Sequence, residues 1–267
     1  MGSPLVTFLS DFGRDDWFVG VVHGVIHAIS PETRVVDIGH AGPPGQVGRA
    51  AFILEAAAPD FAPGTIHLAV VDPGVGTRRR PIVVRARGQS FVGPDNGILE
   101  WALADPAAEA FAITEERFLR KPVSRTFHAR DVFAPVAAHL ARGESIANFG
   151  ARIQDAARRP NARPRAVAGD IVGQVMFVDR FGNALTNIAV EDLLAHLGSA
   201  PEESLEVEAA GRVIRGLSRA YGDAPVGTLV TLVGSSGRLE ISQVGGDAAE
   251  RLGLSAGDEV RVRGTGG

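Results

Sequence analysis

Four short polar clusters carry most of the side chains that could do chemistry. They are "SDFGRDD" (10–16), "DPGVGTRRR" (72–80), "GPDNG" (93–97) and "TFHARD" (126–131). The first three follow strand-like runs and the fourth precedes a helix-like one. In an open α/β sheet, ligands bind beyond the carboxyl ends of the strands. Carboxylate, guanidinium and imidazole groups placed there can handle protons and stabilise charge.

Each cluster also has a purely structural interpretation. Asp11 can make an Asx-turn in which Gly13 takes a positive φ. Residues 72–74 suit a type II turn, with Pro at the second position and Gly at the third, and residues 95–97 suit a turn followed by a helix cap. His128 can be a satisfied core histidine. Four such clusters at one end of one sheet favour a ligand site over four coincidences.

The N-terminal part of the chain alternates strand-like and helix-like segments. The expected strands are 4–10, 35–39, 64–72, 81–86 and 90–94, and the expected helices are 17–30, 46–58, 96–104 and 130–143. Pro135 in the last helix predicts a short first turn or a kink. The alternation predicts an α/β domain over residues 1–160, Rossmann-like and with a largely parallel sheet.

The C-terminal part has a different texture. Residues 157–169 are rich in Pro, Arg and Asn without apolar periodicity, and we expect a linker there. Beyond it, short strand signals alternate with Gly and Asp turns and are interrupted by short helical patterns near 190–198 and 247–254. This texture predicts a small β-barrel domain, or a sandwich, over residues 170–267.

Composition excludes several classes of protein. The 267 residues are 45% hydrophobic, which is enough for two domains with cores, and the net charge of −4 provides no basic field for nucleic acid. No cysteine is present, so disulfides, thiolate nucleophiles and Cys-ligated zinc are excluded. The glycine-rich segments match neither a P-loop nor a dinucleotide fingerprint.

Metal and membrane sites are not expected either. His23 and His27 have helical i, i+4 spacing, but they lie in an apolar stripe region where packing is the favoured role. The N-terminus lacks a signal-peptide pattern, and no apolar run approaches the roughly 20 residues of a membrane span. We therefore expect a cytoplasmic protein without a metal and without a membrane partner.

Six ordered motifs resemble those of the S-adenosyl-L-methionine (SAM) hydroxide adenosyltransferases, adenosine-forming SAM hydrolases related to fluorinases and chlorinases. The motifs are "SDFG..D" (10–16), "VVDPGVGTRRRP" (70–81), "FVGPDNG" (91–97), "TFHARDVFAPVAA" (126–138), "VDRFGNALTNI" (178–188) and "GSSGRLEI" (234–241). The resemblance implies an α/β domain followed by a β-barrel, and a homotrimer with ligand sites between subunits. It implies no cofactor, because SAM is the substrate.

The resemblance also implies roles for single residues. Asp72, Arg79 and His128 match an Asp-Arg-His set that handles the water attacking C5′ of the ribose, whereas Arg78 and Arg80 are expected at surface or structural positions. The substrate-binding matches are Asp11 for the ribose hydroxyls, Asp16 and Asp179 for the methionine amino group, Ser235 for the methionine end, and Phe181, Asn183 and Tyr221 for adenine. For Phe181 and Tyr221, a core aromatic is the alternative. Ser236 replaces an arginine that holds the substrate carboxylate in some relatives.

The expected reaction is hydrolysis of SAM to adenosine and L-methionine. One alternative is a halide adenosyltransferase on the same scaffold; in that branch Tyr replaces the Asp and the Arg is absent. Asp72 and Arg79 favour the hydrolase, because a carboxylate repels an incoming halide. The other alternative is a non-catalytic adenosine- or SAM-binding protein, which would keep Asp11, Phe181 and Asn183 without needing the Asp-Arg-His set.

Overall fold

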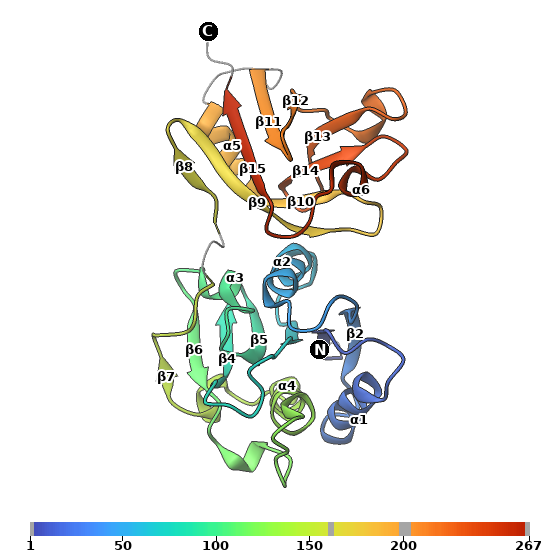
Figure 1. The fold of residues 1–267 in the computed structure, drawn as a ribbon. Coiled ribbons are helices and arrows are strands. Elements are labelled where there is room, and N and C mark those ends of the chain that lie inside the picture. The colour runs from blue at the N-terminus through green and yellow to red at the C-terminus, as the bar shows by residue number, and fades with distance from the viewer. Residues whose placement is uncertain (1–2, 160–162, 198–203, 265–267) are drawn as a thin grey trace. The chain divides into compact units, whose positions relative to one another are not determined.

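The chain folds into two compact units, residues 1–159 and 160–267 (Figure 1). The computed structural model describes residues 3–159, 163–197 and 204–264. Each unit has its own sheet and its own hydrophobic core. No helix within these described ranges is long and apolar enough to cross a membrane.

The N-terminal unit is built on a mixed sheet. Within residues 3–159, its seven strands lie in the order β2-β1-β3-β5-β4-β6-β7. The strands are β1 (Leu5–Ser10), β2 (Arg34–Gly39), β3 (Ile66–Val70), β4 (Pro81–Ala86), β5 (Gln89–Pro94), β6 (Glu109–Ala112) and β7 (Arg152–Ile153). Strands β2, β1, β3 and β5 run parallel, whereas β4, β6 and β7 pair antiparallel.

The expectation of a largely parallel sheet is therefore wrong for one half of it. Only two residues, Arg87 and Gly88, connect β4 to β5, and their φ angles are 53° and 75°. Two successive positive φ angles are typical of a type I′ hairpin turn, and so short a connection can join only antiparallel strands. The Rossmann-like character of the parallel half stays a prediction.

Within residues 3–159, four helices cover the sheet. They are α1 (Phe18–Ile29), α2 (Val47–Ala57), α3 (Glu100–Leu103) and α4 (Ala134–Ala141), with short 3-10 turns at Ala58–Asp60, Glu116–Phe118 and Ile146–Phe149. The first two helices lie where the apolar spacing predicted them. Helix α3 is shorter than expected, since Gly97 has a φ of +92° and the chain becomes helical only at Glu100.

The predicted helix over 130–143 begins irregularly. Residues Ala129–Phe133 form a π-helical turn, and α4 follows it with Pro135 in its first turn. A proline is tolerated there because its missing N–H needs no partner in the first turn of a helix. The π turn places His128 at the start of the element, next to the pocket described below.

Both faces of the sheet are buried, which explains why its central strands are mainly apolar. Side chains on successive strand residues point to opposite faces. Phe8 accordingly packs in the core that includes Val22 of α1 and Val136 of α4, while Leu9 packs in the core that includes Leu54 of α2.

The C-terminal unit is a barrel-like antiparallel sheet. Its strands among the described residues are β8 (Arg165–Val167), β9 (Asp170–Val178), β10 (Ala184–Ala189), β11 (Leu205–Ala209), β12 (Arg212–Arg215), β13 (Leu229–Val233), β14 (Arg238–Gln243) and β15 (Glu259–Gly264). The path runs β12-β11-β15-β9-β10-β14-β13, with β8 beside β9. Ser218 N donates to Thr231 O over 2.8 Å, which nearly closes the two ends of this path. The helices of this unit are α5 (Val190–Leu197) and α6 (Ala248–Leu252), and Tyr221–Asp223 is a 3-10 turn.

The predicted linker contains a strand. Residues 160–162 of it lie outside the described residues, but Arg165–Val167 form β8 and pair with β9. The connection is again a two-residue loop, Ala168 and Gly169, with φ angles of 51° and 88°.

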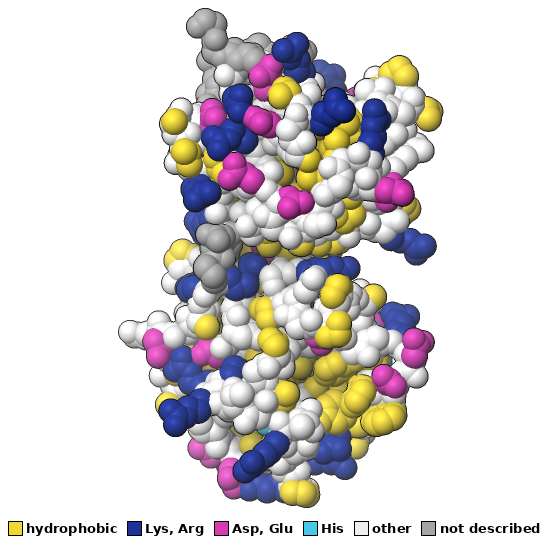
Figure 2. Space-filling model, in the orientation of Figure 1, with side chains coloured by type: hydrophobic (Ala, Val, Ile, Leu, Met, Phe, Trp, Pro, Cys, Tyr) yellow, Lys and Arg dark blue, Asp and Glu magenta, His cyan; other side chains and the backbone are white. Residues whose placement is uncertain are grey.

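In the view of Figure 2, Lys and Arg side chains are interspersed with Asp and Glu on each unit.

Candidate active site

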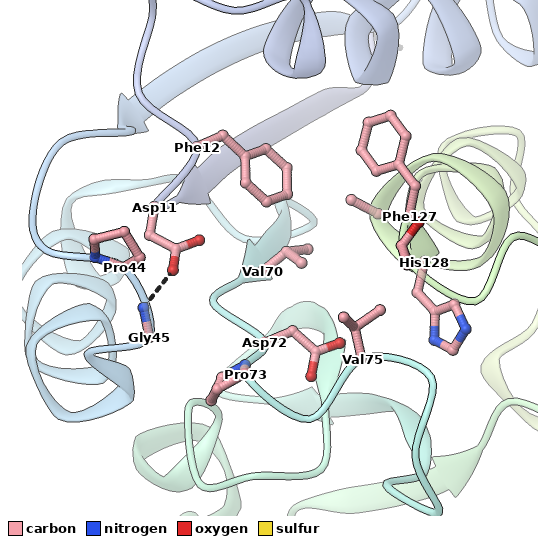
Figure 3. A pocket seen from close by; sticks show the side chains of 12 residues that line it. Asp11, Phe12, Pro44, Gly45, Val70, Asp72, Pro73, Val75, Phe127 and His128 are labelled. Carbon is pink, nitrogen blue, oxygen red and sulfur yellow. Dashed lines mark hydrogen bonds between the residues drawn. The ribbon is translucent and has the colours of Figure 1, made fainter.

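A pocket of about 340 Å³ opens at the carboxyl ends of β1 and β3 in the N-terminal unit (Figure 3). Two of the predicted residues reach it from these neighbouring parallel strands: Asp11 follows β1, and Asp72 follows β3. His128 reaches it from the start of the π turn. The lining consists of Asp11, Phe12, Pro44, Gly45, Val70, Asp72, Pro73, Val75, Thr126, Phe127, His128 and Ala129. The sheet thus brings three of the four polar clusters to one pocket, whereas the fourth, "GPDNG", is not among the lining residues.

Asp72 and Arg79 form a buried two-point ion pair. Arg79 Nε donates to Asp72 Oδ1 over 3.1 Å, and Arg79 Nη2 donates to Asp72 Oδ2. The two side chains are 6% and 7% exposed, which keeps water from competing for the pair. A guanidinium matches a carboxylate in this fork geometry, which fixes the orientation of both groups. Each Asp72 oxygen still has a lone pair for a further donor.

The same guanidinium also fixes His128. Arg79 Nη2 lies 3.0 Å from His128 Nδ1, and the guanidinium lies 5.3 Å from the ring centre of Phe133. Because a guanidinium only donates, His128 Nδ1 must accept, and the ring proton of a neutral His128 is on Nε2. Arg79 Nη1 is buried and has no hydrogen-bond partner among the residues that the structure describes.

The surroundings of His128 favour its neutral form. Burial lowers the pKa of His128, and the positive charge of Arg79 lowers it further, while Asp72 and Asp131 oppose this shift. At neutral pH the imidazole therefore accepts at Nδ1 and presents an N–H at Nε2. His128 is not a core histidine, since its side chain lines the pocket.

The three consecutive arginines have three different environments. Arg78 is exposed, and Arg79 turns inward to Asp72. Arg80 pairs with Asp95 and Asp155 over 2.7 and 2.9 Å. This divergence fits the start of β4 at Pro81, because side chains alternate in extended backbone. The structural role expected for Arg80 is confirmed.

A glycine allows the loop after Asp72 to pack against the segment that carries His128. Gly76 has a φ of +75°, and a Cβ on it would lie 2.4 Å from the backbone oxygen of Arg125. The loop starts with a turn in which Val75 N donates to Asp72 O. This is not the expected type II turn, since Gly74 does not have a positive φ.

Asp11 is held by a neighbouring loop. Gly45 N donates to Asp11 Oδ2 over 2.7 Å, while Gly13 has the expected positive φ of 73°. The carboxylate is therefore fixed by Gly45 rather than by an Asx-turn. Asp16, five residues after Asp11, is exposed and is not among the lining residues.

The cluster "GPDNG" is structural in this chain. Asp95 accepts hydrogen bonds from Arg80 and, over 2.7 Å, from Ala157 N. Asn96 Oδ1 accepts from Ile98 N over 3.2 Å, which matches the predicted turn, but the predicted helix cap is wrong because α3 begins at Glu100 without a side-chain cap. In "TFHARD", Asp131 is fully buried and accepts from Arg130 and from Ser124 N. The pKa of Asp131 is lowered because these hydrogen bonds outweigh the effect of burial.

The remaining predicted residues lie in the C-terminal unit. The loop between β9 and β10 is organised by Asp179, whose Oδ1 accepts from Phe181 N and Asn183 N over 2.8 and 3.0 Å. Asp179 Oδ2 accepts from Asn183 Nδ2 over 2.9 Å. Gly182 has a φ of +81°, and a Cβ on it would lie 2.1 Å from the Asp247 side chain. The motif "VDRFGN" thus specifies a tight loop.

Both aromatic side chains of the predicted adenine pocket are exposed in this unit. Phe181 is 71% exposed and Tyr221 is 44% exposed. The core-aromatic alternative is therefore wrong for Phe181, and Tyr221 is only partly covered. Tyr221 Oη donates to Glu240 Oε2 over 2.7 Å.

Glu240 was not predicted from the sequence. Its side chain is 5% exposed and lies against the "GSSG" loop, since a Cβ on Gly234 would meet it at 1.8 Å. Burial raises the pKa of Glu240, and the nearby Asp179 raises it further, while the bond from Tyr221 opposes the shift. One charged residue inside the apolar strand "RLEIS" was the signal. In the same loop Ser235 is exposed, and the buried Ser236 Oγ has no partner among the described side chains.

No group of three or more His, Asp or Glu side chains that could hold a metal ion is found in the described parts of the chain. His23 and His27, the i, i+4 pair on α1, have different environments. His23 Nε2 lies 2.8 Å from Asp37 Oδ1, while His27 is exposed.

Comparison with known proteins covers both units. The N-terminal domain of SAM hydroxide adenosyltransferase matches residues 6–150, and the C-terminal domain of the same family matches residues 173–261. The (R)-S-adenosyl-L-methionine hydrolase of Salinispora tropica is 40% identical over 97% of this chain and 98% of its own. The protein of the same name from Thermus thermophilus is 41% identical over 96% of this chain and 98% of its own.

More distant relatives and solved structures agree with these matches. A fluorinase from Nocardia brasiliensis is 28% identical over 97% of both chains. The crystal structure of an uncharacterized conserved protein from Thermotoga maritima superposes with a TM-score of 0.89 at 36% identity, over 97% of this chain and 99% of that one.

Proposed function

The chain belongs to the SAM hydroxide adenosyltransferase family, and we propose that it hydrolyses S-adenosyl-L-methionine to adenosine and L-methionine. Relatives at 40–41% identity over nearly the full length bear the name (R)-S-adenosyl-L-methionine hydrolase. The observation that carries the proposal is the Asp72–Arg79–His128 set at the pocket, because an acid paired with Arg is suited to water and unsuited to an incoming halide anion.

Asp11 anchors the ribose in this proposal. Its Oδ2 accepts from Gly45 N, and the carboxylate faces the pocket (Figure 3). A carboxylate can accept from two neighbouring hydroxyl groups at once, as the 2′- and 3′-hydroxyls of a ribose require. Asp72 and His128 line the same pocket, so the ribose C5′ has a route to the reacting groups.

Asp72 and His128 divide the work on the attacking water. His128 Nδ1 is engaged by Arg79, so its Nε2–H donates to the water oxygen and orients it. Asp72 retains acceptor capacity beside Arg79, so it accepts the proton that the water loses. The second lone pair of the water then points at C5′. This assignment gives His128 the role of a donor and Asp72 the role of the base.

The reaction itself replaces one bond at carbon. The water oxygen forms a bond to C5′ as the C5′–S bond breaks, and the bonding electron pair goes to sulfur, which becomes the neutral thioether of methionine. One water proton stays on the new 5′-hydroxyl and the other goes to Asp72. Positioning along the line of the C–S bond supplies several kcal/mol of the rate acceleration.

The C-terminal unit supplies the remaining contacts. Phe181 and Tyr221 offer exposed aromatic faces for adenine, and Asn183 has its Nδ2 on Asp179, so its Oδ1 meets the adenine amino group. Asp179, with Asp16 of the other unit, pairs with the methionine ammonium, and Ser235 contacts the methionine end. We propose that these residues meet the pocket across the subunit boundaries of a homotrimer, as the family resemblance implies.

We further propose that no metal or other cofactor takes part. The guanidinium of Arg79 already supplies positive charge beside the nucleophile, and the sulfonium provides a neutral leaving group. Activity should then be unaffected by EDTA. A small, polar, dissolved substrate fits a cytoplasmic enzyme, and no nucleic acid or membrane partner is required.

Hydrolysis in H₂¹⁸O tests the proposal directly. Purified protein is incubated with SAM, and the products are identified by mass spectrometry. We expect adenosine and methionine in equal amounts, with one ¹⁸O in the adenosine. Adding chloride or fluoride should yield no 5′-halogenated nucleoside, and recovery of such a product would support the halide adenosyltransferase instead. Tight SAM binding without turnover would support the non-catalytic alternative.

A further inference from the structure

A chain of polar contacts lies behind the Asp11 loop, outside the pocket. It begins at Ser10, the last residue of β1, whose Oγ lies 2.7 Å from His40 Nδ1. His40 Nε2 lies 3.1 Å from Asp37 Oδ1 as an ion-pair contact without hydrogen-bond geometry, whereas His23 Nε2 forms a hydrogen bond with the same oxygen over 2.8 Å. Ser10 and His40 are only 3% and 1% exposed. These four residues are not among those that line the pocket.

One arrangement of protons fits the contacts of Ser10 and His40. Phe12 N donates to Ser10 Oγ over 3.3 Å, so the Ser10 hydroxyl proton is free to donate to His40 Nδ1. A neutral His40 then carries its proton on Nε2, where it faces the Asp37 carboxylate. Burial lowers the pKa of His40 despite the opposing effect of Asp37, which is consistent with a neutral ring.

His40 holds the Asp11 loop at two points. Through Ser10 it supports the N–H of Phe12, and through its own carbonyl it accepts from Gly13 N over 2.8 Å. Asp11 lies between these two anchored positions in the sequence. The residue that follows β2, His40, therefore fixes the backbone of Asp11, while Gly45 fixes its carboxylate from the other side.

We propose that His40 is a positioning residue that holds Asp11 in the orientation that selects a ribose with a 2′-hydroxyl, acting through Ser10. The inference rests on the proposed function for the identity of the substrate. Outer partners that orient binding groups, such as those behind metal ligands, are typically worth about 10- to 100-fold in binding or activity.

The test compares SAM with its 2′-deoxyribose analogue. His40→Gln keeps a donor toward Asp37 but removes the acceptor at the position of Nδ1, whereas His40→Asn keeps an acceptor there. Ser10→Ala removes the hydroxyl with little change in volume. We expect kcat/KM for SAM to fall about 10-fold or more in His40→Gln and Ser10→Ala, with a much smaller fall for the analogue. His40→Asn should recover most of the selectivity, and His27→Gln, an exposed position, should match wild type.

A general loss of stability would lower activity toward both substrates by the same factor, and that result would overturn the proposal. So would unchanged selectivity in both His40→Gln and Ser10→Ala. If His40→Gln does not fold, Ser10→Ala carries the test. Calorimetric binding of adenosine and 2′-deoxyadenosine gives the same comparison without turnover, so a failure of SAM hydrolysis in wild type remains distinguishable from a failure of this inference.

Discussion

Arg79 Nη2 donates to His128 Nδ1 over 3.0 Å while the same guanidinium forms a two-point ion pair with Asp72. One buried side chain thereby fixes an acid and an imidazole relative to each other. The contact also determines the tautomer of His128, because a guanidinium has no acceptor. In the proposed mechanism this makes Asp72 the base and His128 the donor that orients the water.

Asp72→Asn should lower kcat by about 10²- to 10⁴-fold with little change in KM. Asn preserves the turn that starts at residue 72 but removes the charge that pairs with Arg79 and accepts the proton. His128→Ala should cost a comparable factor, and the double variant should lose less than the product of the two, since both groups serve one water. Steady-state kinetics measures this, and a wild-type rate in Asp72→Asn would reduce residue 72 to a turn former.

Arg79→Lys should lower kcat by about 10²-fold or more, because an ammonium cannot bind both Asp72 oxygens in a fork and reach His128 as well. Arg78→Lys, at the exposed neighbouring position, is the matched control and should retain wild-type kinetics. Equal losses in the two variants would show that the effect comes from the loop rather than from the contacts of Arg79.

The pH profile should report the neutral state of His128. Burial and Arg79 lower its pKa, so kcat/KM should stay level around pH 6.5 and fall only at lower pH, as protonation of Nδ1 breaks the contact with Arg79. The unfolded chain takes up this proton near pH 6.5, so the stability contributed by neutral His128 is present above pH 6.5 and is lost as the pH falls below it. His128→Gln should lack this kinetic limb. A limb centred above pH 6.5 would contradict the assignment.

Gly76→Ala should lower both stability and kcat. Its φ of +75° disfavours a side chain, and the new Cβ would meet Arg125 O at 2.4 Å, so the loop must move away from the segment that carries His128. Gly143→Ala is the control, because Gly143 has a φ of +90° and a Cβ added to it would meet nothing within 4 Å. The control should lose about 1–2 kcal/mol of stability in urea unfolding and keep its kcat.

Tyr221→Phe should raise KM about 3- to 10-fold with little effect on kcat, since it removes one hydrogen bond and leaves buried Glu240 without its donor. Glu240→Gln retains an acceptor for Tyr221 and should have a smaller effect. Adenosine affinity measured by calorimetry should follow the same order. A fall in kcat without a change in KM would place these residues near the reacting atoms rather than beside the adenine ring.

Much of the site could be predicted because its residues are local to strand ends. Asp11 follows β1 directly and Asp72 lies two residues after β3, so the parallel pairing alone brings them to one pocket. His128 could not be positioned in this way. Its distance to Arg79 depends on the irregular segment that follows β6 and on the close packing of Gly76 against Arg125, and neither leaves a periodic pattern in the sequence.

The errors in the fold have a common physical origin. Both the antiparallel β4–β5 pair and the β8 strand in the expected linker depend on a two-residue loop that ends in glycine, Arg87-Gly88 and Ala168-Gly169. Apolar runs define where strands lie, but the loop length decides whether the next strand runs antiparallel. Reading those two loops as hairpin turns would have predicted the mixed sheet. Glu240 was missed because its role follows from its burial and from its hydrogen bond with Tyr221. Neither can be read from the residue type alone.

The π-helical turn at Ala129–Phe133 makes this segment sensitive to length. Such a turn holds one residue more than the regular helix that it interrupts, and each residue of a regular helix turns the chain by about 100°. Deleting one residue between His128 and Pro135 would therefore produce a smoother and more stable helix, yet it would rotate the imidazole away from Arg79. Selection for thermal stability and selection for turnover would then act in opposite directions on the same short segment. Substitutions should therefore be tolerated there far more readily than insertions or deletions.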